Sequence, residues 1–164
     1  MTTDFGYFEQ GIDRVYANLP GEARQQVLLT RLYAHVFKML EARLNRELAE
    51  HGLNTSTWLA LLLAYSSPGR SVHPSQVSEV AISSRTHATR VGAELEQRGW
   101  ITRELCAGDR RRVELRLTPR GVALVERMLP VQRRRIQAIW STLSDGEQHT
   151  LERLLRKMLG ALAD

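Results

Sequence analysis

The apolar positions of this chain recur with helical spacing near both ends and alternate only in one central segment. From Glu22 to His51, leucines return every fourth residue, which predicts a long amphipathic helix that Gly52 ends. A second helix, capped by Asn54 or Thr55, is apolar on nearly every side, as buried helices are. The same spacing predicts a short helix within the first 20 residues.

The C-terminal part of the chain predicts two more helices. Thr118 caps the first and Pro119 opens it. This helix runs to about Trp140, and we expect a bend before Pro130, because an interior proline removes one backbone hydrogen bond. Residues 144–147, Ser-Asp-Gly-Glu, form a capping box for the last helix, whose leucines lie on one stripe.

Residues 74–99 predict two helices joined by a tight turn. Pro74 suits a first helical position, where its missing N–H is not needed. Residues 81–83 are too few for anything but a turn, and Ser83 or Ser84 offers a hydroxyl cap to the second helix. Gly99 ends that helix after a basic last turn. Two helices joined this tightly form a helix-turn-helix.

The second of these helices has two distinct faces. At about 100° per residue, Ala88, Val91 and Leu95 point one way. The opposite face carries small residues, hydroxyls and arginine. It is either an ordinary solvated face or a surface for a DNA major groove, where Arg pairs with guanine and Thr methyls touch thymine. The candidate DNA-binding residues are Ser84, Arg85, Thr86, His87, Thr89 and Arg90, of which Arg85, Thr86, Thr89 and Arg90 would read bases.

A β-prone hairpin follows this helix. Residues 100–105 favour a strand, residues 106–109 a turn, and residues 113–117 alternate apolar and charged side chains, as a strand with one buried face does. Residues 71–73 are a candidate third strand. Arg110, Arg111 and Arg112 stand beside the hairpin tip. A helix-turn-helix followed by such a hairpin is a winged helix, whose arginines would lie on the DNA backbone or in the minor groove.

The charge balance favours a polyanionic partner. The chain has 23 Lys and Arg against 18 Asp and Glu, a net charge of +5. Residues 84–121 hold nine arginines and five acidic residues, so most of the excess lies in the segment predicted to read DNA.

The segment DRRRVELRLTPRG, from Asp109 to Gly121, resembles the wing signature of the MarR family of bacterial winged-helix regulators. SSRTHATR (Ser83–Arg90) and ELEQRGWI (Glu94–Ile101) resemble its multidrug-efflux repressor branch, the EmrR/MprA type. The resemblance spans about residues 27–162. It implies a homodimeric repressor that binds double-stranded DNA at a palindromic operator, with Asp109 buttressing the wing by pairing with an arginine.

The resemblance also implies a crevice between the dimer-forming helices and the head. Small hydrophobic or phenolic effectors would bind there and release the repressor from an efflux operon. Aromatic, leucine and methionine side chains on the appropriate helices suit such a crevice, and they are equally ordinary core residues. The candidate ligand-binding residues are Tyr33, Phe37, Trp58, Leu62 and Met128.

These patterns predict a mainly α protein with a small β wing, a winged helix-turn-helix head plus a helical dimerisation region. Residues 1–164 would form one domain, with 1–52 and 119–164 as the helical region and 53–118 as the head. Because the first and last helices carry apolar stripes outside the head, we expect a partner to cover them, and a two-fold dimer is the commonest solution. Paired heads would read the two halves of a palindrome.

Other chemistry finds little support. The five histidines lack zinc spacing, and no phosphate loop or nucleophile elbow is present, so we expect no metal, cofactor or enzymatic activity. Three alternatives stay open: an enzyme holding an acidic substrate, a winged-helix adaptor that binds protein, and a redox-responsive regulator using the single cysteine, Cys106. One cysteine, no signal pattern and no membrane-length apolar run predict a cytoplasmic protein.

Overall fold

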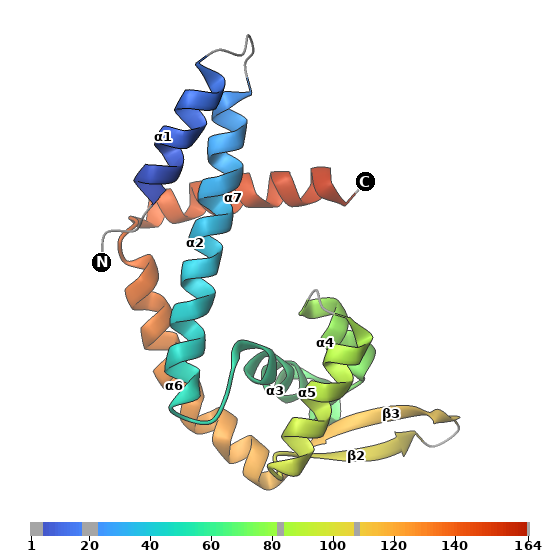
Figure 1. The fold of residues 1–164 in the computed structure, drawn as a ribbon. Coiled ribbons are helices and arrows are strands. Elements are labelled where there is room, and N and C mark those ends of the chain that lie inside the picture. Colours follow the sequence, from blue (N-terminus) through green and yellow to red (C-terminus); the bar gives the residue numbers. More distant parts are fainter. Residues whose placement is uncertain (1–4, 18–22, 82–83, 107–108, 164) are drawn as a thin grey trace. The chain divides into compact units, whose positions relative to one another are not determined.

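The computed structural model describes residues 5–17, 23–81, 84–106 and 109–163, with side chains described outside 106–112. The chain divides into two compact units, residues 1–60 and 61–164. None of the described helices combines the length and apolar character that crossing a membrane requires. The elements in chain order (Figure 1) are α1 (Phe5–Tyr16), α2 (Arg24–Ala49), α3 (Thr55–Ser66), η1 (Pro68–Arg70), β1 (Ser71–Val72), α4 (Pro74–Val80), α5 (Arg85–Gln97), β2 (Ile101–Cys106), β3 (Asp109–Leu117), α6 (Pro119–Trp140) and α7 (Asp145–Leu162).

In the first unit, α1 packs against α2 through aromatic and charged contacts. The Phe5 ring lies 5.4 Å from the His35 imidazole, measured between ring centres. The guanidinium of Arg31 lies 5.6 Å from the centre of the Phe8 ring, within cation–π range. An ion pair between Arg24 and Asp13 also joins the two helices. The short N-terminal helix that the sequence predicts is therefore confirmed.

The corner between α2 and α3 is held by two asparagines. Gly52, with φ of 70°, turns the chain where an L side chain would be strained. Asn54 Oδ1 accepts the backbone N–H of Thr57 at 2.9 Å, so Asn54 is the cap of α3. Asn45 Oδ1, from the last part of α2, accepts the backbone N–H of Thr55 at 2.7 Å. The predicted helix stop and helix start are both confirmed.

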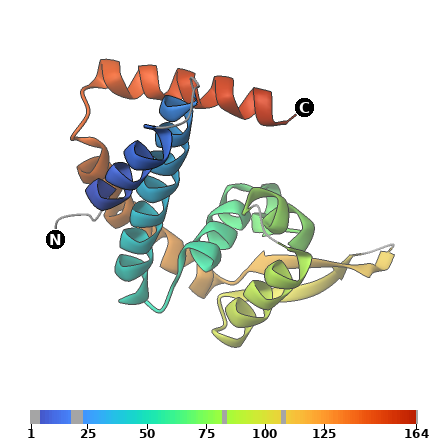
Figure 2. The ribbon, with the colours of Figure 1, turned by 45° about the horizontal axis from the view of Figure 1, so that its top comes forward.

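In the second unit, a three-stranded antiparallel sheet in the order β1-β3-β2 lies beside α4 and α5 (Figure 2). The predicted third strand is confirmed, since Ser71 pairs with Arg116. Leu115 and Leu117 face the core and are 1% and 7% exposed. In both views the β2–β3 hairpin projects beyond the two helices. The arrangement is the predicted winged helix-turn-helix.

A close junction joins the base of the hairpin to α6. The backbone N–H of Thr118 donates to the carbonyl of Trp100 at 3.1 Å. The Thr118 hydroxyl donates to the Gly99 carbonyl at 2.8 Å and accepts the Gly121 N–H at 3.0 Å, which confirms the predicted cap. A Cβ at Gly121 would lie 2.1 Å from the Trp100 oxygen. Glycine is required here because no side chain fits.

The C-terminal helices follow the sequence pattern. α6 continues through Pro130, and the bend expected there stays a prediction. The capping box of α7 is confirmed, since the backbone N–H of Ser144 donates to the Glu147 carboxylate at 2.8 Å. The predicted turn residues Ile82 and Ser83 lie outside the described residues.

Candidate nucleic-acid interface

Helix α5 buries one face and exposes the other. The Ser84 hydroxyl accepts the His87 backbone N–H at 3.2 Å and caps the first turn, as predicted. Ala88, Val91 and Leu95 are 0%, 4% and 1% exposed. The opposite face is open to solvent, and the predicted division of the helix is confirmed. Its exposed residues are Arg85, Thr86, Thr89, Arg90, Ala93 and Gln97.

Contacts within α5 orient side chains on that exposed face. The Thr89 hydroxyl donates to the Arg85 carbonyl at 3.0 Å, which leaves its methyl group and oxygen lone pairs for a ligand. Nη2 of Arg90 lies 3.1 Å from Nδ1 of His87. Because a guanidinium only donates, the ring nitrogen of His87 is the acceptor in this contact. The His87 ring therefore steadies the side chain of Arg90.

The hairpin carries the arginine run in a strand. β2 and β3 pair from Ile101 with Leu117 to Cys106 with Asp109, with an irregularity between Leu105 and Cys106. The backbone of residues 110–112 thus belongs to β3. The side chains of Arg110, Arg111 and Arg112, with those of Asp109 and Cys106, lie outside the described residues. The wing contacts to DNA and the Asp109 buttress stay predictions.

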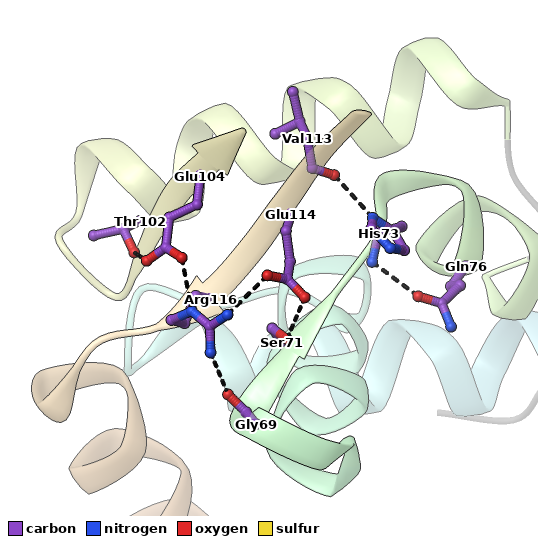
Figure 3. A network of polar contacts seen from close by, with 9 residues as sticks. All are labelled: Gly69, Ser71, His73, Gln76, Thr102, Glu104, Val113, Glu114 and Arg116. Carbon is purple, nitrogen blue, oxygen red and sulfur yellow. Dashed lines mark hydrogen bonds and ion pairs between the residues drawn. The ribbon is translucent and has the colours of Figure 1, made fainter. Parts of the chain in front are cut away.

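Arg116 organises the polar face of the sheet (Figure 3). Its guanidinium donates to the carboxylate of Glu104 on β2 at 2.9 Å and to that of Glu114 on β3 at 2.8 Å. A third bond, of 2.8 Å, reaches the Gly69 carbonyl in η1. Glu114 also accepts the hydroxyl of Ser71, on β1, at 2.6 Å. One arginine therefore links the strands and the preceding turn at the base of the wing.

This network favours the charged form of Glu114. The hydrogen bond from the Ser71 hydroxyl, and then the charges of Arg116 and His73, hold the pKa of Glu114 below its usual range despite partial desolvation. The His73 ring also reaches β3, where its Nδ1 lies 3.1 Å from the Val113 carbonyl (Figure 3). The network therefore extends to His73, the N-cap residue of α4.

Two arginines on the hairpin were not among the sequence candidates. Arg116 lies on the outward face of β3, as alternation predicts, but its partners follow from the register between strands. Arg103, on β2, is opposite Leu115 and donates from Nη2 to the Thr89 carbonyl of α5 at 2.9 Å. An arginine at an inward strand position was the available signal, because alternation predicts an apolar residue there.

The five candidate ligand residues occupy two environments. Tyr33 and Phe37 are 56% and 57% exposed on α2, whereas Trp58 and Met128 are 7% and 1% exposed, and Leu62 is partly exposed on α3. The ligand site therefore stays a prediction. Within the described ranges no three potential metal ligands cluster. An open apolar hollow at the start of α7 is lined by other residues: Leu143, Gly146, Glu147, Thr150, Leu151 and Leu154.

Comparison with known proteins identifies the fold and its relatives. The model of the MarR family matches residues 53–113, which include the helix-turn-helix and most of the hairpin. The chain is 42% identical over 139 residues to the transcriptional repressor MprA of Escherichia coli K12. The aligned stretch covers 84% of this chain and 78% of the relative. The chain belongs to the MarR family.

Solved structures of MarR-family regulators share the fold. Sco3205 from Streptomyces coelicolor, in complex with DNA, matches with a TM-score of 0.81 at 24% identity, covering 90% of this chain and 93% of that one. A cysteine-to-serine mutant of MarR from Escherichia coli, complexed with operator DNA, matches with a TM-score of 0.74 at 25% identity, covering 85% and 99%. The predicted MarR-like winged-helix fold is confirmed, and the chain is a DNA-binding transcriptional regulator.

Proposed function

We propose that the chain is a homodimeric repressor that reads its operator with α5 and holds the DNA backbone with the hairpin. The observation that carries the proposal is the exposed face of α5, where Arg85, Thr86, Thr89 and Arg90 lie opposite a buried face. Guanidinium groups and hydroxyls with methyls are the chemistry that reads base edges in the major groove. The arginines of residues 110–112 would add sequence-independent phosphate contacts.

The dimer is supported by apolar surface that a single chain leaves exposed. Large apolar side chains on neighbouring turns of α2 stay open to solvent, and α7 carries a similar stripe. Contiguous apolar patches of this kind mark interaction surfaces, and a second copy of the chain would cover them. The exposed residues are Leu29, Leu32, Tyr33, Val36 and Phe37 on α2, and Leu154, Met158, Leu159 and Leu162 on α7.

We infer further that the regulated operon encodes multidrug efflux and that small hydrophobic or phenolic compounds release the repressor. The support is the similarity to the repressor MprA, 42% identity over 139 residues, together with the resemblance of residues 83–90 to the efflux-repressor branch. A ligand releases DNA only if it binds the DNA-competent arrangement of the heads less well than another arrangement. Such a regulator catalyses no reaction and acts in the cytoplasm, beside the chromosome.

Footprinting on the DNA upstream of the protein's own gene and of its neighbours tests the repressor. A palindrome with half-sites about one helical turn apart, roughly 10 base pairs, is expected for paired heads. Titration of phenols and small hydrophobic weak acids against that complex tests release. Compounds that bind the free protein without lowering its DNA affinity would refute inducer release, and protection of one isolated half-site would refute the dimer.

A further inference from the structure

Arg103 connects the hairpin to α5, the helix proposed to read bases. It projects from the inward face of β2, and its Nη2 donates to the backbone carbonyl of Thr89 in α5 at 2.9 Å. Its Nε, which solvent does not reach, lies 3.2 Å from Oε2 of Glu96, close enough for an ion pair but without hydrogen-bond geometry. Thr89 and Glu96 are seven residues apart, so the guanidinium links two positions about two helical turns apart along α5.

A glycine on α5 makes room for this contact. A Cβ at Gly92 would lie 3.2 Å from Nη2 of Arg103 and 3.2 Å from a methyl of Leu115. Those separations are tighter than ordinary van der Waals contact, so the side chains of β2 and β3 approach the helix backbone closely only because Gly92 has none. The helix tolerates this interior glycine although alanine has the higher helix propensity.

We propose that Arg103 is a positioning residue that sets the offset between the base-reading face of α5 and the arginines of the hairpin. The proposal rests on the proposed reading of bases by α5. Specific binding requires the helix in the major groove and the wing on the backbone at the same time, in one register. Non-specific binding depends on phosphate charge and tolerates other arrangements. Arg103 therefore affects specificity through the protein's own geometry.

The alternative role for an arginine beside a DNA-reading helix is a direct phosphate contact. Its donors argue against that role, because one guanidinium nitrogen is bonded to Thr89 and another faces the Glu96 carboxylate. The carboxylate also offsets the charge that a phosphate would attract. The two roles make different predictions for a change at Glu96, a loss of specificity in one case and tighter binding to any duplex in the other, and this difference is the basis of the test.

Three variants disturb the contact with different changes of charge. Arg103→Met removes one positive charge, Glu96→Gln removes one negative charge, and Gly92→Ala changes none while crowding the guanidinium. Arg120→Met is the matched control, since it removes a positive charge from an exposed arginine in the first turn of α6. Each protein is titrated against a duplex that the wild type selects from a randomised pool and against a scrambled duplex, at several salt concentrations.

Positioning predicts that all three variants lower the ratio of selected to scrambled affinity. We expect a fall of roughly tenfold for Arg103→Met, the scale of a lost charge-assisted hydrogen bond, and smaller falls for the other two. The ratio does not depend on the fraction of folded protein, so simple destabilisation leaves it unchanged. The control should weaken both duplexes alike and keep the ratio.

A phosphate role for Arg103 predicts another pattern. Arg103→Met would weaken both duplexes alike and reduce the salt slope by about one, and Glu96→Gln would strengthen binding to both. That pattern, or a ratio unchanged in all three variants, overturns the proposal while leaving the base-reading function intact. A wild type that selects no sequence overturns both.

Discussion

Replacing Gly121 with alanine tests the junction between the hairpin and α6. Helix propensity alone predicts that alanine stabilises the first turn of α6 by up to about 1 kcal/mol. The added Cβ, however, would lie 2.1 Å from the Trp100 carbonyl oxygen and 3.1 Å from a methyl of Leu117. Carbon and carbonyl oxygen normally come no closer than about 3.3 Å. The backbone would therefore have to separate by roughly an ångström.

That separation breaks the hydrogen bonds of the junction. Thr118 bonds the Trp100 carbonyl through its N–H at 3.1 Å and the Gly99 carbonyl through its hydroxyl at 2.8 Å. Two such bonds contribute about 1 kcal/mol each, and overpacking costs about 1–3 kcal/mol more. After the propensity gain is subtracted, the variant should lose about 2–4 kcal/mol of unfolding free energy. The steric effect outweighs the propensity.

Thermal unfolding followed by circular dichroism measures this difference. For a chain of this size, the melting temperature falls by about 2–4 °C per kcal/mol. Gly146→Ala is the matched control, because Gly146 also lies in the first turn of a capped helix and an added Cβ there meets nothing within 4 Å. The control should be neutral or slightly stabilising. A Gly121→Ala protein as stable as the wild type would refute the argument that the close approach excludes a side chain.

Three further predictions concern the DNA-reading face, the dimer and the wing network. Arg90→Ala should cost about 1–3 kcal/mol of operator affinity and relax base preference, measured by competition among duplexes randomised in one half-site; an unchanged preference would show that Arg90 reads no base. Leu159→Glu places a charge in the exposed stripe of α7. If the protein is the dimer proposed above, this variant should sediment as monomers and lose operator binding; a persisting dimer would place the interface elsewhere. The lowered pKa of Glu114 contributes stability that is present above the unfolded-state pKa and lost as pH falls through the lower folded-state pKa. The Glu114→Gln variant should therefore lose less stability than the wild type as the pH falls below about 4. Unfolding midpoints measured over a series of acidic pH values test this, and the same pH dependence in both proteins would count against the network.

Helix boundaries were predictable where local chemistry sets them. The caps at Thr118 and Ser144 were predicted from the sequence and are confirmed, and of the two candidates Ser83 and Ser84 the structure has Ser84 as the cap of α5. Such predictions succeed because a cap depends on one side chain and the next few backbone amides. Gly52 was predictable for the same reason, since its positive φ serves a turn right after the helix. Features that depend only on neighbouring residues, such as helix caps and turn glycines, can therefore be predicted from the local sequence.

The polar contacts of the hairpin were not predictable in that way. Alternation correctly assigned Leu115 and Leu117 to the core face, but two of the three partners of Arg116 lie on other segments of the chain, one on β2 and one in η1. Those partners follow from the register of β2 and β1 against β3, which the turn and the packed face set together. The contact of Arg103 was harder still to predict, because it depends on how β2 packs against α5 and on the space that Gly92 leaves between them.

Charge counting treats the nine arginines of residues 84–121 alike, whereas the structure separates the six whose side chains it describes by the contacts they make. Every acidic side chain of that stretch within the described residues pairs with an arginine: Glu94 with Arg98, Glu96 with Arg103, and Glu104 and Glu114 with Arg116. These arginines fix protein geometry, and their partners offset their charge. We therefore expect the positive field that a duplex meets to come from Arg85 and Arg90 on α5 and Arg120 in α6, together with the run at 110–112, whose side chains lie outside the described residues. Because only cations that neutralise phosphates release counterions, the salt dependence of DNA binding should follow this second group and not the total.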